Sequence, residues 1–554
     1  MILKKFPVLI LALFLFACQQ TTEPQQAVAT AHPIATQAGI DILNQGGNAF
    51  DAAVAVSATL AVVEPYSSGM GGGGFWLLQR ASDNKSVMVD GREVAPLQAD
   101  RDMYLDKQGN VIPKLSMDGP LAAGIPGQPA ALVHISKKYG SLSLGKVLAP
   151  AIQAAQQGFP VTEHYQRMAK FRLDVLRASP DAAKIFLQNN EVPELGFLIK
   201  QPDLANTLQK MVVQGADGFY KGDVAWGLVQ GTRKAGGIWS LTDLERYQVI
   251  ERQPLTGQFG DYKVTSVAPA SSGGVAILSM LNMLELHNWS SLTDIDQKHL
   301  LIEVMRRAYR DRALYLGDSD FVAVPVKKLI SKEYTRQLGN DIDLTMATPS
   351  AMLPGIDDQP KGNHTTHFSI IDRQGNRVAA TLSINYPFGS CFVPPGTGIL
   401  LNDEMDDFSS KPGTPNAYGL VGAEANAIAP GKRMLSSMSP TIIESKDKLA
   451  ILGTPGGSRI ITMVLNSILG VAQGKSAKQI VSAPRFHHQY LPDEVQYEPS
   501  AFTSREVEEL EKRGHTLHEL KYKYGNMQVV IVNKQTNQVT AASDPRGEGN
   551  SIVQ

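Results

Sequence analysis

The sequence predicts an α+β protein in which layered sheets are flanked by helices. Strand-like runs such as VAATLSI, TIIES, KLAILG and MQVVIVN alternate with helical stretches, among them residues 458–470 and 504–513, and this alternation suits sheets covered by helices. The 43% hydrophobic and 19% charged content among 554 residues is that of a globular protein with a large core. Length alone would allow about three or four domains. Because Gly and Pro are spread along the chain without a long low-complexity linker, we expect one intertwined unit.

The first eighteen residues have the pattern of an export signal. Lys4 and Lys5 precede the apolar residues 6–16, and the polar run QQTTEPQQ follows Cys18. The apolar stretch is short for a bilayer span, which disfavours a retained transmembrane helix. We therefore interpret residues 1–18 as a signal peptide and residues 19–31 as a polar tether.

The end of this signal, LFAC at residues 15–18, resembles a bacterial lipobox. In such a motif Cys18 is diacylated and becomes the mature N-terminus. A plain secretory signal cleaved nearby is the alternative. Gln19 and Gln20 are not the Asp that would indicate inner-membrane retention, so we expect a periplasmic protein anchored to the outer membrane.

Charge and cysteine content exclude several classes of function. A formal net charge of -1 without a local run of Lys and Arg disfavours nucleic-acid partners. Cys391 is the only cysteine besides Cys18, so no intramolecular disulfide is expected. The surrounding GSCFVPPG offers Cys391 no neighbouring His or cation, and we predict a buried thiol rather than a nucleophile.

Two helices are predicted over residues 32–63. An amphipathic segment closes at Gly46-Gly47, and Asn48 leads into FDAAVAVSATLAVV, whose small residues on every side indicate a buried helix. Next, SSGMGGGG runs into the apolar FWLLQ, a loop entering a strand. Because this loop lacks the Lys-Ser/Thr pair and the following helix of a phosphate-binding loop, we interpret its glycines as close backbone packing beside a pocket.

The middle of the chain predicts helices that end at an exposed segment. Residues 144–286 alternate helical stretches with turns, and residues 275–286 and 300–316 are helical. Residues 345–364 are polar and rich in turn residues, and directly after them TTHFSII and VAATLSI flank the turn DRQGN as a β-hairpin. A loose loop that runs abruptly into a buried hairpin indicates that the chain is cut there.

The hairpin begins with HTTHFS, which resembles the autocleavage site of γ-glutamyltranspeptidases. Further motifs in the order of that family are APAIQAAQQGF, PASSGG, LLNDEMDDFS, MLSSMSP, TPGGSRI, APRFHHQ and ASDPR, and together they cover nearly all of the mature chain. The resemblance implies a four-layer αββα sandwich of the N-terminal-nucleophile hydrolase type, formed jointly by two autocleaved chains. Cleavage after His364 would give a large subunit, 32–364, and a small subunit, 365–554.

Thr365 is the predicted nucleophile. A threonine hydroxyl needs a base, and a free α-amino group on the same residue, with a pKa of about 8, supplies one only after cleavage. The resemblance assigns Ser383 a hydrogen bond to the amine or hydroxyl of Thr365. It makes the backbone N–H groups of Gly456 and Gly457 donors to the developing oxyanion.

The resemblance also implies a clamp for the γ-glutamyl group, which carries an α-carboxylate and an α-ammonium. A cationic fork suits the carboxylate, and acidic acceptors suit the ammonium. In DGREVAP, Arg92 is the predicted fork. The remaining predicted contacts are Ser436 and Ser437 to the carboxylate, and Glu404, Asp407 and Asn385 to the ammonium. By period 2, Thr381, Ser383 and Asn385 are expected on one face of their strand.

Two further features bear on ligands. Tyr418 lies in KPGTPNAYGL, which resembles the lid of the family and favours small γ-glutamyl compounds. His487 and His488 are adjacent on an extended segment, so their side chains diverge, and no other metal-ligand spacing is visible. We expect neither a metal nor another cofactor.

The implied reaction is acyl transfer. Thr365 takes the γ-glutamyl group from glutathione or a related amide, and water, an amino acid or a dipeptide removes it. Two other hypotheses remain open: an acylase of the same superfamily acting on glutaryl-β-lactams or poly-γ-glutamate, and a non-catalytic lipoprotein that retains the fold for binding. The spacing of residues does not distinguish hydrolysis from transpeptidation.

Overall fold

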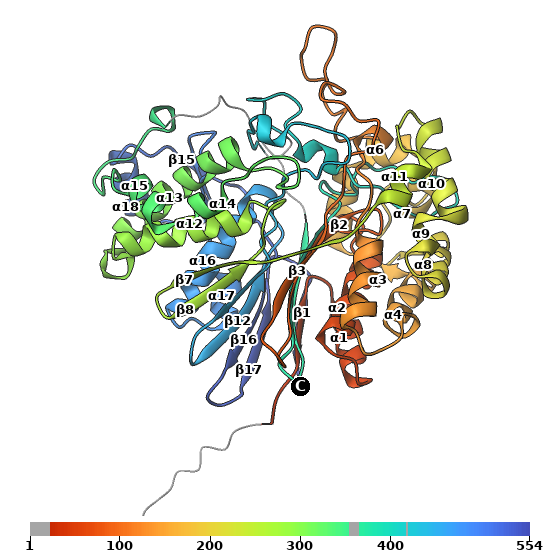
Figure 1. The fold of residues 1–554 in the computed structure, drawn as a ribbon, viewed down its shortest axis with the longest axis horizontal. Coiled ribbons are helices and arrows are strands. Elements are labelled where there is room, and N and C mark those ends of the chain that lie inside the picture. Colours follow the sequence, from red (N-terminus) through yellow and green to blue (C-terminus); the bar gives the residue numbers. More distant parts are fainter. Residues whose placement is uncertain (1–22, 354–364, 417–418) are drawn as a thin grey trace, which may run out of the picture.

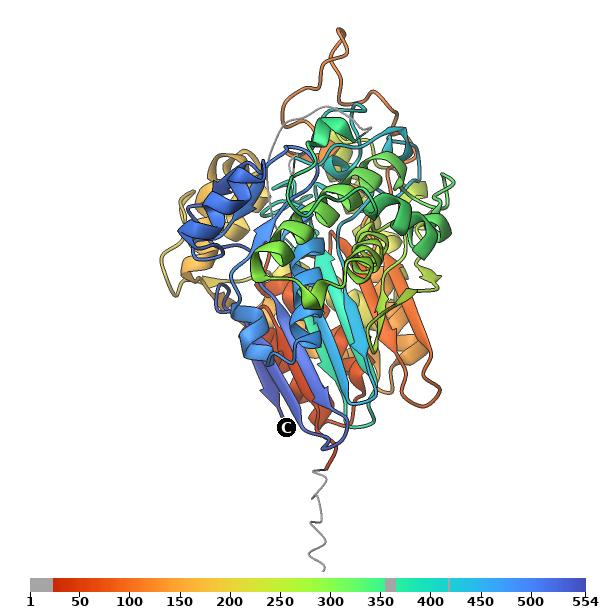
Figure 2. The ribbon, with the colours of Figure 1, turned by 90° about the vertical axis from the view of Figure 1, so that its left-hand side faces the viewer.

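The computed structural model describes residues 23–353, 365–416 and 419–554, which build four layers in the order helix, sheet, sheet, helix (Figure 1). The two sheets face each other, and both are antiparallel throughout. Figure 2 shows the strands of both sheets in the lower half of the molecule, with helices and loops above them. The predicted αββα sandwich is confirmed.

The first sheet has seven strands in the order β18-β1-β9-β10-β2-β3-β6. Their bounds are β1 (Ala27–Thr30), β2 (Gly73–Gln79), β3 (Ser86–Gly91), β6 (Ile250–Arg252), β9 (Thr366–Ile371), β10 (Arg377–Ser383) and β18 (Asn550–Val553). β9 and β10 form the predicted hairpin, closed by a hydrogen bond from the N–H of Asp372 to the carbonyl of Asn376.

The second sheet has six strands in the order β17-β16-β12-β11-β8-β7. Their bounds are β7 (Leu255–Phe259), β8 (Tyr262–Ser266), β11 (Thr441–Glu444), β12 (Lys448–Gly453), β16 (Gln528–Asn533) and β17 (Val539–Ser543). Both sheets take strands from before and after Thr365. Neither part of the chain can complete a sheet alone, so the two parts form one intertwined unit.

Each sheet is covered on its outer face by helices (Figure 1). The helices over the first sheet include α1 (Pro33–Asn44), α2 (Ala49–Val63), α3 (Gln128–Tyr139) and α4 (Leu144–Gln157). Those over the second sheet include α12 (Gly273–Leu286), α13 (Asp294–Tyr315), α16 (Ile460–Ala472) and α17 (Ala477–Ser482).

The remaining α-helices and two small sheets lie outside these groups. The other helices are α5 (Glu163–Phe171), α6 (Leu173–Ala178), α7 (Pro180–Phe186), α8 (Pro202–Gln214), α9 (Asp217–Tyr220), α10 (Gly222–Lys234), α11 (Leu241–Arg246), α14 (Val326–Leu329), α15 (Lys332–Gly339) and α18 (Ser504–Lys512). Two small sheets pair β4 (Phe159–Pro160) with β5 (Leu198–Ile199), and β13 (Phe486–His487) with β14 (Val495–Tyr497) and β15 (Leu517–Glu519).

Helix α2 is buried on every face, as its composition predicts. Asn48 caps it by accepting hydrogen bonds from the N–H groups of Phe50 and Asp51, and the side chain of Asp51 accepts from the N–H of Asn48 in return. This reciprocal capping satisfies backbone donors that the buried start of a helix would otherwise leave unpaired.

The start of the described chain corrects one prediction. Within the predicted polar tether, residues 19–31, Ala27–Thr30 form β1, a buried strand between β18 and β9. Ala27 and Ala29 face the second sheet, whereas Val28 faces the helices. Small side chains fit the narrow space between two packed sheets, so this short segment is part of the core rather than a linker.

The predicted signal peptide, including Cys18, lies outside the described residues. Over the ranges that the structure does describe, no helix combines the length and the apolar character needed to cross a bilayer.

Candidate active site

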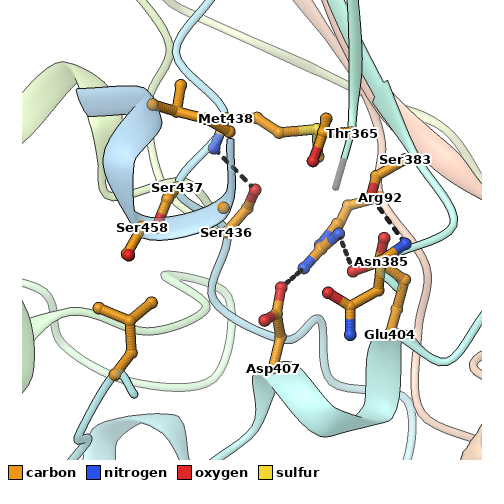
Figure 3. Close-up of a pocket in the computed structure, with 13 residues that line it drawn as sticks. Arg92, Thr365, Ser383, Asn385, Glu404, Asp407, Ser436, Ser437, Met438 and Ser458 are labelled. Carbon is orange, nitrogen blue, oxygen red and sulfur yellow. Dashed lines mark hydrogen bonds and ion pairs between the residues drawn. The ribbon is translucent and has the colours of Figure 1, made fainter. Parts of the chain in front are cut away.

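Thr365 lies immediately before β9, where the central hairpin of the first sheet begins, and is only 6% exposed. It lines a pocket of about 280 Å³, here called the inner pocket (Figure 3). The predicted site residues that also line the inner pocket are Arg92, Ser383, Asn385, Glu404, Asp407, Ser436, Ser437 and Gly457. Segments that are hundreds of residues apart in the sequence thus meet at Thr365.

Ser383 and Asn385 enter the pocket from the end of β10. The hydroxyl of Ser383 accepts a hydrogen bond from the N–H of Asn385 at 2.8 Å, and the amide of Asn385 donates to the carbonyl of Asp403 at 3.0 Å. Asn385 has a φ of 71°, so the strand has already ended and period 2 does not place it. Thr381 does not line the inner pocket, because it is buried with its hydroxyl 2.8 Å from Nδ1 of His367.

The glycine-rich loop before β2 packs closely against the backbone at the end of β10. A Cβ on Gly72 would lie 2.2 Å from the carbonyl oxygen of Ser383, and one on Gly71 would lie 2.1 Å from that of Leu400. The interpretation of these glycines as close backbone packing beside a pocket is confirmed.

We expect Gly72→Ala to lower the stability of the protein by about 1–3 kcal/mol, because the added methyl group overpacks a rigid backbone contact. The shift in thermal unfolding temperature measures this loss. Gly145→Ala is the matched control, because Gly145 lies on helix α4 and its Cβ would approach only the side-chain atom Cγ1 of Val212, at 3.1 Å, and no backbone atom. Equal unfolding temperatures for the two variants would contradict the packing role of Gly72.

Gly456 and Gly457 connect β12 to α16. Their φ angles of 144° and 55° are strained for residues with a side chain, and a Cβ on Gly456 would lie 2.5 Å from Cε of Met463. A short helical turn, η6 (Gly457–Arg459), then leads into α16. The backbone N–H groups at this end of α16 give a positive potential beside Thr365.

Arg92, Glu404 and Asp407 form an ionic triad in which Arg92 and Glu404 are buried and Asp407 is partly buried. Arg92 follows β3, and Glu404 and Asp407 are three residues apart on the 3-10 turn η4 (Glu404–Asp407), where side chains at this spacing align. One guanidinium nitrogen of Arg92 donates to Glu404 and another to Asp407, as Figure 3 shows. The triad thus presents a cation and two carboxylates to the same pocket.

Within this triad the opposite charges stabilise each other's ionised forms against the effect of burial. Burial disfavours the charged form of Arg92, but Glu404 and Asp407 outweigh it and raise the pKa of Arg92. Burial raises the pKa of Glu404 to about 7 against the opposing effect of Arg92. The pKa of Asp407 is also raised, and burial is the largest cause. A ligand ammonium beside these acids would favour their charged forms.

Ser436 and Ser437 are held by PASSGG, a motif distant in sequence. The N–H of Ser436 donates to the carbonyl of Ala270 at 2.9 Å, and the hydroxyl of Ser272 donates to the carbonyl of Ser436 at 2.7 Å. The hydroxyl of Ser436 accepts from the N–H of Met438 at 3.0 Å. These bonds fix the loop that carries both predicted serines.

Sequence reasoning missed Arg312 on α13. It is 4% exposed and donates to the hydroxyls of Ser272 at 3.1 Å and of Ser437 at 3.3 Å. Burial lowers the pKa of Arg312 to about 10, and the nearby charge of Asp407 opposes that change. The charged run RRAYRDRALY has the composition of a solvated helix face, so no local signal marks Arg312 as a buried support of the pocket.

The remaining predicted residues do not line the inner pocket. Gly456 lines a neighbouring pocket, and Tyr418 and His364 lie outside the described residues. The rings of His487 and His488 contact different partners, Thr462 and Asp493 respectively.

Cys391 is buried as predicted, although Arg172 provides a cationic neighbour that its local sequence does not show. Burial outweighs this neighbour and raises the pKa of the Cys391 thiol to about 12. At neutral pH the side chain is therefore a neutral thiol, which is a poor nucleophile.

Comparison with known proteins shows one family over nearly the whole chain. The family model described as gamma-glutamyltranspeptidase matches residues 35–554. The chain is 42% identical over 528 residues to the glutathione hydrolase proenzyme of Escherichia coli K12, covering 94% of this chain and 90% of that protein. It is 40% identical over 538 residues to the glutathione hydrolase proenzyme of Pseudomonas aeruginosa PAO1, covering 95% and 94% of the two chains.

Two solved structures share the fold. The cephalosporin acylase of Bacillus halodurans superposes with a TM-score of 0.83 at 27% identity, covering 96% of both chains. The γ-glutamyltranspeptidase of Helicobacter pylori superposes with a TM-score of 0.57 at 40% identity, covering 59% of this chain and 94% of that chain.

Proposed function

The chain belongs to the γ-glutamyltranspeptidase family of self-processing γ-glutamyl hydrolases and transferases, and we propose that Thr365 is its nucleophile. One observation carries this proposal. Thr365 shares the inner pocket with Gly457, an oxyanion-donor candidate, and with the triad of Arg92, Glu404 and Asp407. A nucleophile, an oxyanion donor and a zwitterion-binding group are what γ-glutamyl transfer requires.

Maturation cuts the bond between His364 and Thr365. The hydroxyl of Thr365 attacks the carbonyl of the preceding peptide bond, and water then releases the large subunit, 32–364, from the small subunit, 365–554. The intertwined sheets support a heterodimer that stays together after the cut, because both sheets contain strands from each part. Cleavage frees the α-amine of Thr365, which has an ordinary pKa of about 8 and suits a general base.

Catalysis then runs in two steps on that residue. The amine takes the hydroxyl proton of Thr365, the oxygen attacks the γ-carbonyl, and the backbone N–H groups of Gly456 and Gly457 stabilise the oxyanion. Ser383 orients the nucleophile by a hydrogen bond. Collapse of the intermediate releases the amine and leaves a γ-glutamyl ester on Thr365, which water, an amino acid or a peptide resolves.

The triad and its neighbours bind the far end of the γ-glutamyl group. Arg92, Ser436 and Ser437 hold the α-carboxylate, whereas Glu404, Asp407 and Asn385 hold the α-ammonium.

Product analysis tests this function most directly. Glutathione incubated with the mature protein should give glutamate and cysteinylglycine, and an added dipeptide acceptor should give a γ-glutamyl tripeptide in addition. Unchanged glutathione together with a single uncut chain on a denaturing gel would instead support the non-catalytic binding protein.

An acylase acting on glutaryl amides is a second candidate, because the acylase of Bacillus halodurans has a similar fold. The inner pocket argues against it. A glutaryl group lacks the ammonium that Glu404 and Asp407 would bind, and so leaves a buried acid and a partly buried one without a ligand partner.

Export and lipidation of Cys18 complete the proposal. We expect Cys18→Ala to move the protein from the membrane fraction to the soluble periplasmic fraction with unchanged specific activity, because the lipid is attached through the thiol. Fractionation followed by an assay with a γ-glutamyl anilide measures both properties. Unmodified wild-type protein found wholly in the soluble periplasm would favour a plain secretory signal.

A further inference from the structure

Two buried hydroxyls of the inner pocket accept hydrogen bonds from groups that cannot accept one in return. The hydroxyl of Ser436 accepts from the N–H of Met438 at 3.0 Å, and that of Ser437 accepts from the guanidinium of Arg312 at 3.3 Å. Over the residues that the structure describes, neither hydroxyl proton has an acceptor. Both protons are therefore left for a ligand in the inner pocket, which both serines line (Figure 3).

Arg312 also supports the loop that carries Ser436. Its Nε donates to the hydroxyl of Ser272 at 3.1 Å, and that hydroxyl donates to the carbonyl of Ser436 at 2.7 Å. The N–H of Ser272 donates to the same carbonyl at 2.8 Å. Because a hydroxyl has one proton, the bond from Arg312 leaves that of Ser272 for the carbonyl of Ser436. One guanidinium thus joins the PASSGG loop to the loop of the two predicted serines.

The charge of Arg312 has no direct partner. Arg312 is 4% exposed, and among the described residues no carboxylate lies at ion-pair distance from it. Arg92, by contrast, pairs with both acids of the triad and lies 3.5 Å from a third acid, Glu93. A buried charge without a partner is costly, and a ligand of opposite charge reduces that cost. A positive charge beside the two serine hydroxyls therefore favours a ligand carboxylate there.

We propose that Arg312 is a positioning residue for recognition of the α-carboxylate of the γ-glutamyl group. Its hydrogen bond holds the hydroxyl of Ser437 with the proton turned to the pocket, and its charge strengthens donation by that hydroxyl to the carboxylate. Arg312 does not line the inner pocket, so it acts through Ser437 rather than by touching the substrate. The inference rests on the proposed binding of a γ-glutamyl group in this pocket.

The test compares two inhibitors that differ only at the α-carboxylate. L-glutamate carries it, whereas 4-aminobutyrate lacks it and retains the ammonium. Both compete with a γ-glutamyl anilide for the mature protein. We expect Arg312→Met to raise the inhibition constant of L-glutamate about ten- to a hundredfold, because Ser437 loses a charged donor. The inhibition constant of 4-aminobutyrate and kcat for the anilide should stay within about twofold of the wild type, because neither depends on the carboxylate contact.

Ser437→Ala tests whether Arg312 acts through that hydroxyl. Each single variant should raise the inhibition constant of L-glutamate. The double variant should raise it by clearly less than the product of the two single effects, because both remove the same interaction. This comparison needs L-glutamate alone. Effects that simply multiply would show that Arg312 does not act through Ser437, and would overturn the proposal.

Arg312→Lys provides a second test if the methionine variant does not mature, which a denaturing gel shows. Lysine retains the charge, but its single ammonium cannot replace the fork that spans Ser272 and Ser437. The inhibition constant of L-glutamate should therefore rise about three- to tenfold. An unchanged constant in this variant would count against the positioning role.

Arg310→Met is the matched control on α13. Arg310 pairs with Asp311, donates to the hydroxyl of Tyr334 at 3.2 Å and does not line the inner pocket. Its replacement should leave both inhibition constants unchanged. Equal rises of both constants in Arg312→Met would indicate a general disturbance of the pocket and refute the inference. No aniline release by the mature wild type would instead contradict the proposed role of Thr365.

Discussion

Thr365→Ala is expected to give one uncut chain with no measurable γ-glutamyl transfer. The substitution removes the hydroxyl that attacks the preceding peptide bond and, later, the substrate amide. Loss of a nucleophile that acts together with its base lowers kcat by roughly 10⁴-fold or more. A denaturing gel shows whether the chain is cut, and release of aniline from a γ-glutamyl anilide measures the activity.

Thr365→Ser is the matched variant, because it retains the hydroxyl and removes one methyl group. It should mature and turn over, but more slowly, since serine lacks the χ1 restriction of a β-branched side chain. Thermal unfolding of the alanine variant should show that the uncut chain is still folded. Maturation of that variant into two chains would mean that another group cuts this bond.

The second large effect concerns the triad. We expect the wild type to have about ten- to a hundredfold higher kcat/KM for a γ-glutamyl anilide than for the matched glutaryl anilide. A hydrogen bond to a charged group contributes about 1.5–3 kcal/mol, and the glutaryl compound lacks the ammonium that Glu404 and Asp407 would bind. Asp407→Asn should reduce this ratio, mainly by lowering kcat/KM for the γ-glutamyl anilide.

Arg92→Lys provides the contrast within the same triad. It retains the positive charge beside the buried acids but loses the fork that binds a carboxylate through two hydrogen bonds. Because both anilides carry the carboxylate, kcat/KM should fall for both of them. The ratio of the two kcat/KM values should therefore change little. Equal kcat/KM of the wild type for the two anilides would refute the proposed binding of the ammonium by Glu404 and Asp407. The acylase function would then be the favoured one.

Much of the fold could be predicted from local pattern. The runs KLAILG and VTAAS are β12 and β17, and the helix predicted over 504–513 is α18 within one residue. Where side chains alternate regularly between a core and another surface, periodicity is a reliable signal. It failed at β1, because AVAT is short and lies beside a polar run, and only its place between two strands makes it part of a sheet.

For the candidate site, some residues could be predicted and others could not. Arg92, Glu404 and Asp407 follow from the resemblance to the family, and the structure brings them together in one pocket. Arg312 could not be found, because its role depends on Ser437 from a distant loop. Asn385 lines the pocket in which the resemblance places it, but the strand alternation expected for it is wrong, because β10 ends at Ser383 and Asn385 has a positive φ.

By itself the sequence determined the chemistry available to this protein: a threonine at the start of a buried hairpin, a glycine pair, and a fork and acids suited to a zwitterion. Those choices are local, because side-chain type and backbone propensity belong to single residues and short segments. Tertiary structure alone decided that the three charges of the triad form ion pairs, and that Thr365 lines two pockets, the inner pocket and a neighbouring one. Distances between segments hundreds of residues apart arise from how the two sheets pack, and no local pattern encodes them.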